Sequence, residues 1–164
     1  MSAVHVVVMG VAGCGKSEIG ERIAKALQLP FIEGDAFHPR SNIEKMKSGV
    51  PLDDDDRAGW LDALARELVA RPQGAVLTCS ALKRAYRDRL RAACPHLQFV
   101  HLSLPESEAQ RRVASRPGHF YPPALVASQF AALEDPAGEP GVVVVDACLS
   151  PDEVAARAVE HLRR

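Results

Sequence analysis

The residues from Gly10 to Ser17 have types and a spacing that suit phosphate binding. They read Gly-Val-Ala-Gly-Cys-Gly-Lys-Ser, which fits the pattern G-x-x-x-x-G-K-[ST]. Glycines let the backbone wrap closely around a phosphate with its N–H groups pointing inward, and the start of a following helix adds partial positive charge. The lysine is expected to reach the β- and γ-phosphates of ATP, and the serine hydroxyl to coordinate Mg²⁺. The predicted nucleotide contacts are Gly10, Gly13, Cys14, Gly15, Lys16 and Ser17, with Ser17 also the metal ligand.

Asp35 is the candidate for handling the proton of an acceptor hydroxyl. It follows the short apolar run 31–33, so it is expected at the carboxyl edge of the sheet, where ligands of open α/β sheets bind. A kinase needs such a group, because phosphoryl transfer depends on a positioned acceptor and on charge stabilisation. An Asx turn after Gly34 is a second role for the same carboxylate, and the two roles are compatible.

Two groups of basic residues suggest an anionic acceptor. Lys83, Arg84 and Arg87 place three cations within five positions after the third expected strand, at the ligand edge. Arg57 follows the four aspartates 53–56, which are expected to complement the dipole at a helix start. Some of these cations must face solvent, so the pattern predicts a local anion site without saying which of them forms it.

A third basic group precedes a segment that is rich in proline and glycine. Arg112 and Arg116 are four residues apart, hence on one helical face, and Arg111 is adjacent. The segment about 111–123 is therefore predicted to be a lid over the nucleotide. His119 lies within this loop and carries little weight by its position alone.

The run Val142–Asp146 leaves a second kind of nucleotide-binding protein open. Motor and switch ATPases place an aspartate after an apolar strand to hold Mg²⁺, and this β-branched run ends in Asp146. However, it is the last expected strand, about 130 residues beyond the phosphate loop, so an ordinary strand-end role is favoured. The chain has no N-K-x-D sequence, which argues against a GTPase.

Strand-like runs alternate with amphipathic stretches, which is typical of a parallel α/β sheet. We expect one domain over residues 1–164 with a three-layer fold, in which helices cover both faces of a five-stranded parallel sheet. Expected strands are 4–9, 31–33, 75–79, 98–103 and 142–146, the last buried on both faces. About seven helices are expected. The first follows the glycine-rich turn and carries Ile19, Ile23 and Leu27 on one face. The others are expected over 42–48, 54–71, 83–93, 105–115, 123–133 and after the capping sequence 150–153.

The four cysteines, Cys14, Cys79, Cys94 and Cys148, do not form a metal-binding pattern. Cys79 and Cys148 lie in or beside apolar runs, so we expect buried free thiols there. Cys14 invites a redox interpretation, since a helix start lowers the pKa of a thiol. A small side chain that fills space, while its backbone binds phosphate, is the favoured interpretation.

Composition limits the partners. The chain has 164 residues and a formal net charge of −1, which gives no general reason to expect nucleic acid or an anionic membrane as a partner. Its first apolar run, 4–9, is too short to span a bilayer and has no basic leader before it. We therefore expect a cytoplasmic protein that acts on small molecules.

Several further motifs resemble the gluconokinases of the small P-loop type, which are related in fold to shikimate and nucleoside monophosphate kinases. The resemblance covers nearly the whole chain, from Val6 to Asp146. Its motifs are Gly34-Asp35-Ala36-Phe37-His38-Pro39, Asn42–Met46, Pro51–Arg57 with Trp60-Leu61, Cys79–Lys83 with Tyr86–Asp88, Arg116–Phe120, Ser128–Phe130 and Leu133-Glu134.

This resemblance implies ATP-dependent phosphorylation of the terminal hydroxyl of D-gluconate, giving 6-phosphogluconate. It implies catalytic roles for Lys16, Asp35 and Arg116 and a nucleotide contact for Arg112. An acceptor-binding segment is implied at about 38–60, and relatives suggest a homodimer. The residues implied near gluconate, whose carboxylate suits charge-assisted hydrogen bonds, are Asp35, His38, Arg57, Ser80, Lys83, Arg87 and His119.

Two departures from the family pattern and two alternatives accompany this interpretation. Glu33 stands where many relatives have Asp, so its part in holding Mg²⁺ is open, and Tyr121-Pro122-Pro123 stiffens the exit of the lid. A kinase for another small hydroxy acid, such as shikimate, is one alternative. A regulatory ATPase that uses Asp146 on Mg²⁺ is the other.

Overall fold

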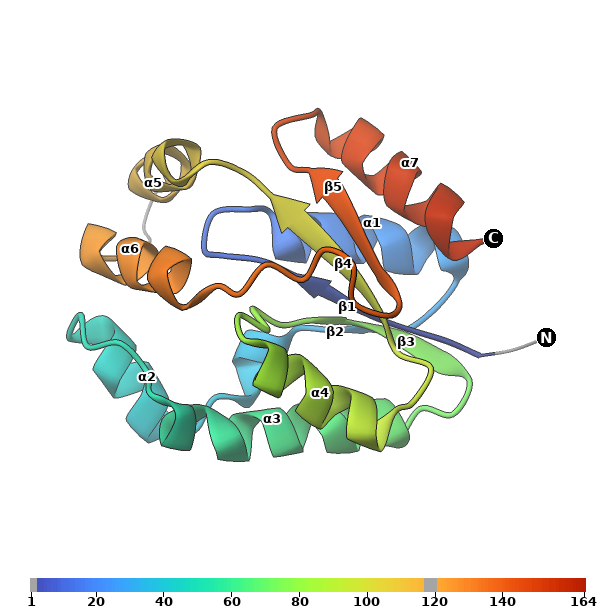
Figure 1. Cartoon of the computed structure of the whole chain (residues 1–164), viewed down its shortest axis with the longest axis horizontal. Coiled ribbons are helices and arrows are strands. Elements are labelled where there is room, and N and C mark those ends of the chain that lie inside the picture. The colour runs from blue at the N-terminus through green and yellow to red at the C-terminus, as the bar shows by residue number, and fades with distance from the viewer. Residues whose placement is uncertain (1–2, 117–120) are drawn as a thin grey trace.

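The structure, a computed structural model, describes residues 3–116 and 121–164. It is built around one five-stranded parallel sheet (Figure 1). The strands are β1 (Val4–Met9), β2 (Phe31–Ile32), β3 (Gly74–Thr78), β4 (Gln98–Ser103) and β5 (Val142–Asp146). Their spatial order is β2-β3-β1-β4-β5, so β1 lies in the centre and the chain crosses to the other half of the sheet between β3 and β4.

In the described ranges, seven α-helices and a short 3₁₀ helix accompany the strands. They are α1 (Lys16–Leu27), η1 (Gly34–Phe37), α2 (Arg40–Lys47), α3 (Asp54–Val69), α4 (Arg84–Ala93), α5 (Glu106–Ala114), α6 (Pro123–Ala132) and α7 (Pro151–Leu162). Helices α1 and α7 pack together on one face of the sheet, and α3 and α4 pack together on the other (Figure 1). The expected three-layer α/β fold is confirmed.

The core lies on both sides of β1. Val6, Val7, Val8 and Met9 are all fully buried, although neighbouring side chains of a strand point to opposite faces. Helices cover both faces of the sheet, which is why a continuous apolar run marks this strand better than alternation would.

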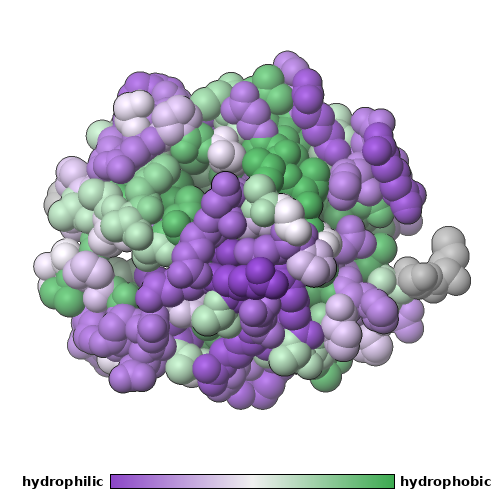
Figure 2. Space-filling model, in the orientation of Figure 1, coloured by the Kyte–Doolittle hydropathy of each residue, from purple (hydrophilic) through white to green (hydrophobic). Residues whose placement is uncertain are grey.

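The prediction for β5 was wrong in one respect. Val144 is 46% exposed, because β5 is an edge strand whose outer neighbour position is empty. Cys148 is also exposed, in contrast to the expectation of a buried thiol, since it lies in the turn after the strand. Cys79 is buried as expected. In Figure 2, hydrophilic residues cover the lower part of the visible face, where α3 and α4 lie, and hydrophobic surface shows in the upper part around β5.

Two helix starts are capped by side chains. Ser150 accepts a hydrogen bond from the Glu153 backbone at 3.2 Å, as the sequence predicts for α7. At α3, Asp53 and Asp56 form a reciprocal capping box, so these two aspartates do more than complement the dipole. No helix in the described ranges is long and apolar enough to cross a membrane.

Candidate active site

A cavity of about 640 Å³ opens along the carboxyl edge of the sheet. It runs from the phosphate loop and the start of α1 to the segment that contains α2 and the start of α3, with α5 and α6 closing one side. The structure brings most of the predicted site residues into this one cavity. They are Gly13, Cys14, Gly15, Lys16, Ser17, Asp35, His38, Arg57, Ser80, Arg112 and Arg116.

The phosphate loop joins β1 to α1 and depends on glycine conformations. Gly10 and Gly13 have φ values of 149° and 85°. A Cβ on Gly10 would lie 2.9 Å from the Leu102 carbonyl oxygen, so this position needs glycine for space as well as for conformation. The Lys16 ammonium donates to the carbonyl oxygens of Gly10 and Val11 at 3.0 and 3.1 Å. The lysine is thus folded over its own loop, where phosphate oxygens can compete for its protons.

Ser17 is linked to the second strand through Glu33. The Ser17 hydroxyl donates to Glu33 Oε2 at 2.7 Å, and the Thr78 hydroxyl donates to Glu33 Oε1 at 2.8 Å. Because the Ser17 hydroxyl donates its hydrogen bond to the Glu33 carboxylate, the lone pairs of Oγ stay available to a cation. The sequence interpretation missed Thr78, which lies on β3, 45 positions from Glu33. No motif marks such a pair.

Asp35 is held at the cavity by the way η1 begins. Gly34 donates its N–H to the Thr78 hydroxyl at 3.0 Å and accepts from Trp60 Nε1 at 2.8 Å. A Cβ on Gly34 would lie 1.8 Å from the Thr78 carbonyl oxygen, so only glycine fits against β3 at this point. The Asp35 side chain is 72% exposed, and one of its oxygens lies 3.7 Å from His38 Nε2. The carboxylate therefore faces the cavity from a fixed backbone.

His38 is a buried histidine beside that carboxylate. Its side chain is only 4% exposed and stacks on Trp60 with ring centroids 4.1 Å apart. Asn42, itself buried, places its amide nitrogen 3.2 Å from His38 Nδ1. Burial lowers the pKa of His38; the Asp35 charge opposes this effect and the Arg57 charge adds to it. The imidazole is therefore neutral around pH 7.

Arg57 and Lys83 both line a smaller neighbouring cavity of about 260 Å³. Arg57 lines both cavities, and its guanidinium carbon lies 5.5 Å from the centre of the Tyr86 ring. Lys83 lines only the smaller one and donates to Asp54 at 2.9 Å; Tyr86 also hydrogen bonds to Asp54. Lys83 is thus adjacent to the main cavity, and its charge is already paired.

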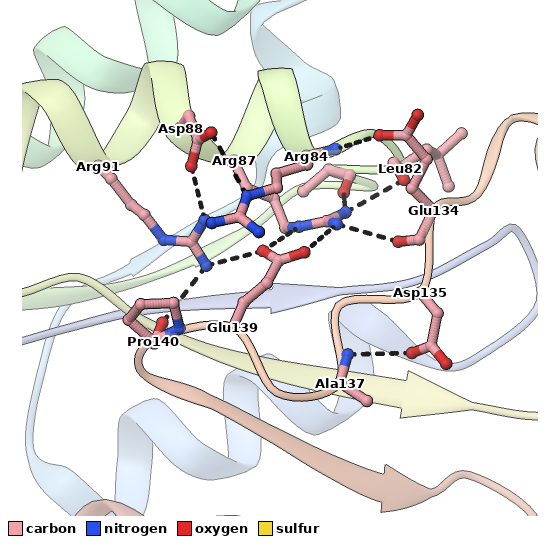
Figure 3. A network of polar contacts seen from close by, with 11 residues as sticks. Leu82, Arg84, Arg87, Asp88, Arg91, Glu134, Asp135, Ala137, Glu139 and Pro140 are labelled. Carbon is pink, nitrogen blue, oxygen red and sulfur yellow. Dashed lines mark hydrogen bonds and ion pairs between the residues drawn. The ribbon is translucent and has the colours of Figure 1, made fainter.

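Arg87 does not reach either cavity. Figure 3 shows its guanidinium enclosed by α4 and the segment that leads to β5. The side chain is fully buried and forms a two-point contact with Glu139 at 2.9 and 2.6 Å. Its other donors go to the carbonyl oxygens of Ala81, Leu82 and Glu134. With its donors satisfied inside the protein, Arg87 has none to offer a substrate, contrary to the sequence expectation.

The Ser80 segment is shaped by that arginine. Ser80 lines the main cavity, and Ala81, which follows it, has a φ of 46°, a conformation that costs energy for a residue with a Cβ. The Arg87 contact to the Ala81 carbonyl at 2.8 Å holds this backbone in place. Arg87 therefore supports the wall of the cavity from behind.

On the opposite side, Arg112 is fixed between the phosphate loop and the turn after β5. It donates to the Ala147 carbonyl at 2.8 Å and to Glu108 at 3.0 Å, and it approaches the Gly13 carbonyl at 3.5 Å. Arg111 and Arg112 together hold the pKa of Glu108 at about 2. Arg116 lines the cavity beyond the end of α5. The predicted contact of His119 lies outside the described residues, as does part of the predicted lid.

Gln129 on α6 is a cavity residue that the sequence interpretation did not single out. Its Oε1 accepts the backbone N–H of Ala12 at 2.7 Å, and its Nε2 donates to the Tyr121 hydroxyl at 2.8 Å. Burial raises the pKa of Tyr121 to about 12, so this phenol is neutral. The segment Ser128–Phe130 was noted in the sequence as part of a pattern, but a contact across 117 positions has no local signal.

Two other predictions concern residues outside the chemistry. Burial raises the pKa of the Cys14 thiol, which favours the space-filling role over redox chemistry. Asp146 accepts the Cys148 backbone N–H at 2.8 Å, a local turn contact, and is not among the residues that line the cavity. Its geometry is that of an ordinary strand-end aspartate.

Comparison with known proteins covers nearly the whole chain. Residues 6–140 match the family model described as an AAA domain. A gluconokinase of Gluconobacter oxydans is 45% identical over 96% of this chain and 90% of its own length. The thermoresistant gluconokinase of Escherichia coli is 41% identical, with 96% and 93% covered.

Solved structures agree with the sequence relatives. A crystal structure of a gluconokinase from Sinorhizobium meliloti has a TM-score of 0.92 and 49% identity, covering 98% of this chain and 92% of its own. A sugar kinase from Janibacter has a TM-score of 0.93 and 42% identity, with 98% and 95% covered. Fold and length are thus shared over nearly the whole chain.

Proposed function

This chain belongs to the gluconokinase family of P-loop kinases, and from that premise we propose how its cavity transfers the γ-phosphoryl group of ATP to D-gluconate. The enzyme is a phosphotransferase with an alcohol group as acceptor, and its product is 6-phosphogluconate. The observation that carries the proposal is that Lys16 and Ser17 line the same cavity as Asp35. Phosphate binding and proton handling thus take place in one cavity.

ATP binds with its phosphates in the loop before α1. The loop's N–H groups and the start of α1 supply partial positive charge, and Lys16 exchanges its two carbonyl contacts for phosphate oxygens. Arg112 lies beside Gly13 and Ala147, which places its cation on the nucleotide side of the cavity. Arg116, from beyond α5, is positioned to cover the transferring group.

Mg²⁺ fits the donors present. Among the described residues, no group of three or more His, Cys, Asp or Glu side chains could form a protein cage for a metal. Mg²⁺ does not need one, because it keeps several waters and binds through phosphate oxygens and one or two protein ligands. Ser17 would hold it through a lone pair of Oγ, while its hydroxyl donates a hydrogen bond to Glu33. When bound, Mg²⁺ neutralises charge that develops on the phosphates.

The acceptor hydroxyl of gluconate is oriented by Asp35. Its oxygen forms a bond to the γ-phosphorus as the bond from that phosphorus to the bridging oxygen of ADP breaks, and its proton passes to the Asp35 carboxylate and then to water. The mobile proton thus leaves on the side opposite the nucleotide. In-line transfer of this kind rests on positioning and electrostatics more than on covalent chemistry.

The carboxylate of gluconate is bound through Arg57, with Ser80 on the same wall. Arg57 is only 8% exposed and lies where the two cavities meet, so it can form a charge-assisted hydrogen bond away from bulk water. Lys83 borders this site from the smaller cavity, where its ammonium is paired with Asp54. We therefore assign acceptor binding to the segment about 38–60. The lid at about 111–123 stays a prediction from the sequence.

One experiment tests the substrate. ADP release with Mg-ATP is measured with gluconate, other aldonates, glucose and shikimate at equal concentrations. The proposal expects gluconate to stimulate release far above the others. Equal rates with all of them contradict the proposal, and a preference for shikimate identifies the alternative kinase. A cytoplasmic location and a homodimer stay predictions from the sequence.

A further inference from the structure

His38 has a geometry that the proposed reaction does not yet use. We propose that it is a positioning residue for Asp35: Asn42 holds the imidazole in the neutral tautomer with its proton on Nε2, and that N–H is aimed at the Asp35 carboxylate. The inference rests on the proposed role of Asp35 in phosphoryl transfer. It differs from the sequence expectation, which placed His38 on gluconate itself.

The tautomer follows from the partners of Asn42. The amide nitrogen of Asn42 lies 2.9 Å from the backbone carbonyl oxygen of Asp56 and 3.2 Å from His38 Nδ1. A carbonyl oxygen can only accept, so the atom that faces it must be the NH₂ group, with its second hydrogen free for Nδ1. Nδ1 is thus the acceptor nitrogen of the ring. A neutral imidazole has one N–H, and it must be on Nε2.

The backbone brings Nε2 to Asp35. Residues three apart eclipse in a 3₁₀ helix, and Asp35 in η1 lies three positions before His38. Pro39 restricts the backbone of His38, which has φ −65° and ψ 133°. Trp60 stacks on the ring with an interplanar angle of 16°, which fixes its plane. The distance of 3.7 Å from Nε2 to Asp35 Oδ1 is longer than a hydrogen bond. A small rotation of the exposed carboxylate brings the two atoms within hydrogen-bond distance.

This arrangement assigns separate tasks to the two oxygens of Asp35. Once the carboxylate has rotated, the oxygen beside Nε2 accepts from the imidazole N–H, which leaves the other oxygen for the acceptor hydroxyl. The charged groups that face His38 are Asp35 in η1, which raises its pKa, and Arg57 in α3, which lowers it. Asn42 and Trp60 are neutral partners. Taking up a proton at Nδ1 would set that N–H against the Asn42 amide. His38 therefore orients the carboxylate and does not relay the proton.

The tautomer can be measured without any turnover. In ¹⁵N-labelled substrate-free protein at pH 7.5, two-bond ¹H–¹⁵N correlation spectra distinguish protonated from bare ring nitrogens, and comparison with His38→Gln assigns the His38 signals. We expect a bare Nδ1 and a protonated Nε2. A proton on Nδ1, or on both nitrogens, overturns the proposal even if the enzyme phosphorylates gluconate normally.

The functional part is tested with two variants of His38. His38→Phe keeps a ring against Trp60 but has no N–H, and we expect kcat to fall by about 10- to 100-fold, the effect of losing one hydrogen bond to a charged group. KM for gluconate should stay within about two-fold. His38→Gln places an amide near the position of Nε2, and it should recover most of kcat.

The outcomes separate the possible roles. A raised KM with unchanged kcat identifies a substrate contact and overturns the positioning role. Equal losses in the Phe and Gln variants, with equal falls in melting temperature, identify a packing role and overturn it too. ATP binding, followed by calorimetry, should be unchanged in both variants. If the wild-type enzyme ignores gluconate, the proposed function fails, and the tautomer measurement still stands by itself.

Discussion

Gln129 on α6 accepts a hydrogen bond from the backbone N–H of Ala12 in the phosphate loop, at 2.7 Å and across 117 positions of sequence. The helix that follows the predicted lid is thus tied to the loop that binds phosphate. The same side chain donates to Tyr121, which stands just before α6. A single amide therefore connects the entry of α6 with the nucleotide site.

Gln129→Ala should loosen this connection. It removes two partly buried hydrogen bonds at about 1 kcal/mol each, which corresponds to a fall of several degrees in melting temperature for a chain of this size. KM for ATP should rise, since the loop loses a support. The matched control is Ser128→Ala, whose hydroxyl donates to the Leu125 carbonyl of its own helix and, among the described residues, to nothing else. Similar behaviour of the two variants would contradict the coupling.

Asp35→Asn should lower kcat by more than about 100-fold, because the amide cannot receive the hydroxyl proton. ATP affinity should change little, since Asp35 lies on the acceptor side of the cavity. Kinetics and calorimetry measure the two effects separately. The control is Asp146→Asn, which removes a carboxylate with only a turn contact. A larger loss in the Asp146 variant would instead support a regulatory ATPase with its Mg²⁺ ligand there.

Arg87→Ala should cost about 3–5 kcal/mol of unfolding free energy, because it leaves Glu139 buried without its main partner. Denaturant unfolding measures this loss. Arg89→Ala is the control on the same helix: its pair with Asp62 is about half exposed, and its loss should cost about 0–1 kcal/mol. If Arg87 instead binds gluconate from its present position, its replacement raises KM with no loss of stability.

Acid should destabilise the protein through His101. This side chain is 5% exposed, its Nδ1 has no partner in the described structure, and burial lowers its pKa below the usual 6.5, with Asp135 opposing and Arg87 reinforcing the shift. The unfolded chain then binds the proton more readily, so stability is full above about pH 6.5 and falls as the pH decreases through the lowered pKa.

The measurement is the free energy of unfolding between pH 5 and 8. We expect His101→Gln to flatten the fall below pH 6.5 relative to the wild type, whatever its effect at pH 8. An unchanged slope would show that other groups account for the acid sensitivity.

Local patterns in the sequence were enough to predict the fold and the phosphate-binding part of the site. The phosphate loop is a contiguous motif, and β1 and α3 show their burial in runs and periodicity, so they could be located without coordinates. The seven α-helices and five strands that were expected are all present in the described ranges. The edge position of β5 could not be found this way, because a β-branched run looks the same in the centre and at the edge of a sheet.

The missed part consists of contacts between polar side chains far apart in sequence. Arg87 appeared to be a substrate cation because it follows a strand at the ligand edge, and its partner Glu139 lies 52 positions away. Thr78 and Glu33 meet across neighbouring strands in the same manner. Such pairs have neither a fixed spacing nor a periodicity, so only the packed structure shows which charges are already satisfied.

The order of the strands places the residues assigned to the acceptor and those assigned to the nucleotide in different halves of the sheet. Asp35 follows β2 and Ser80 follows β3, on one side of β1, whereas Arg112 and Ala147 come after β4 and β5, on the other. In the proposed reaction, the phosphoryl group therefore passes from one half of the sheet edge to the other. It follows that the acceptor specificity of this enzyme can change through the segments after β2 and β3 alone. The residues after β4 and β5, on the nucleotide side, can then stay the same.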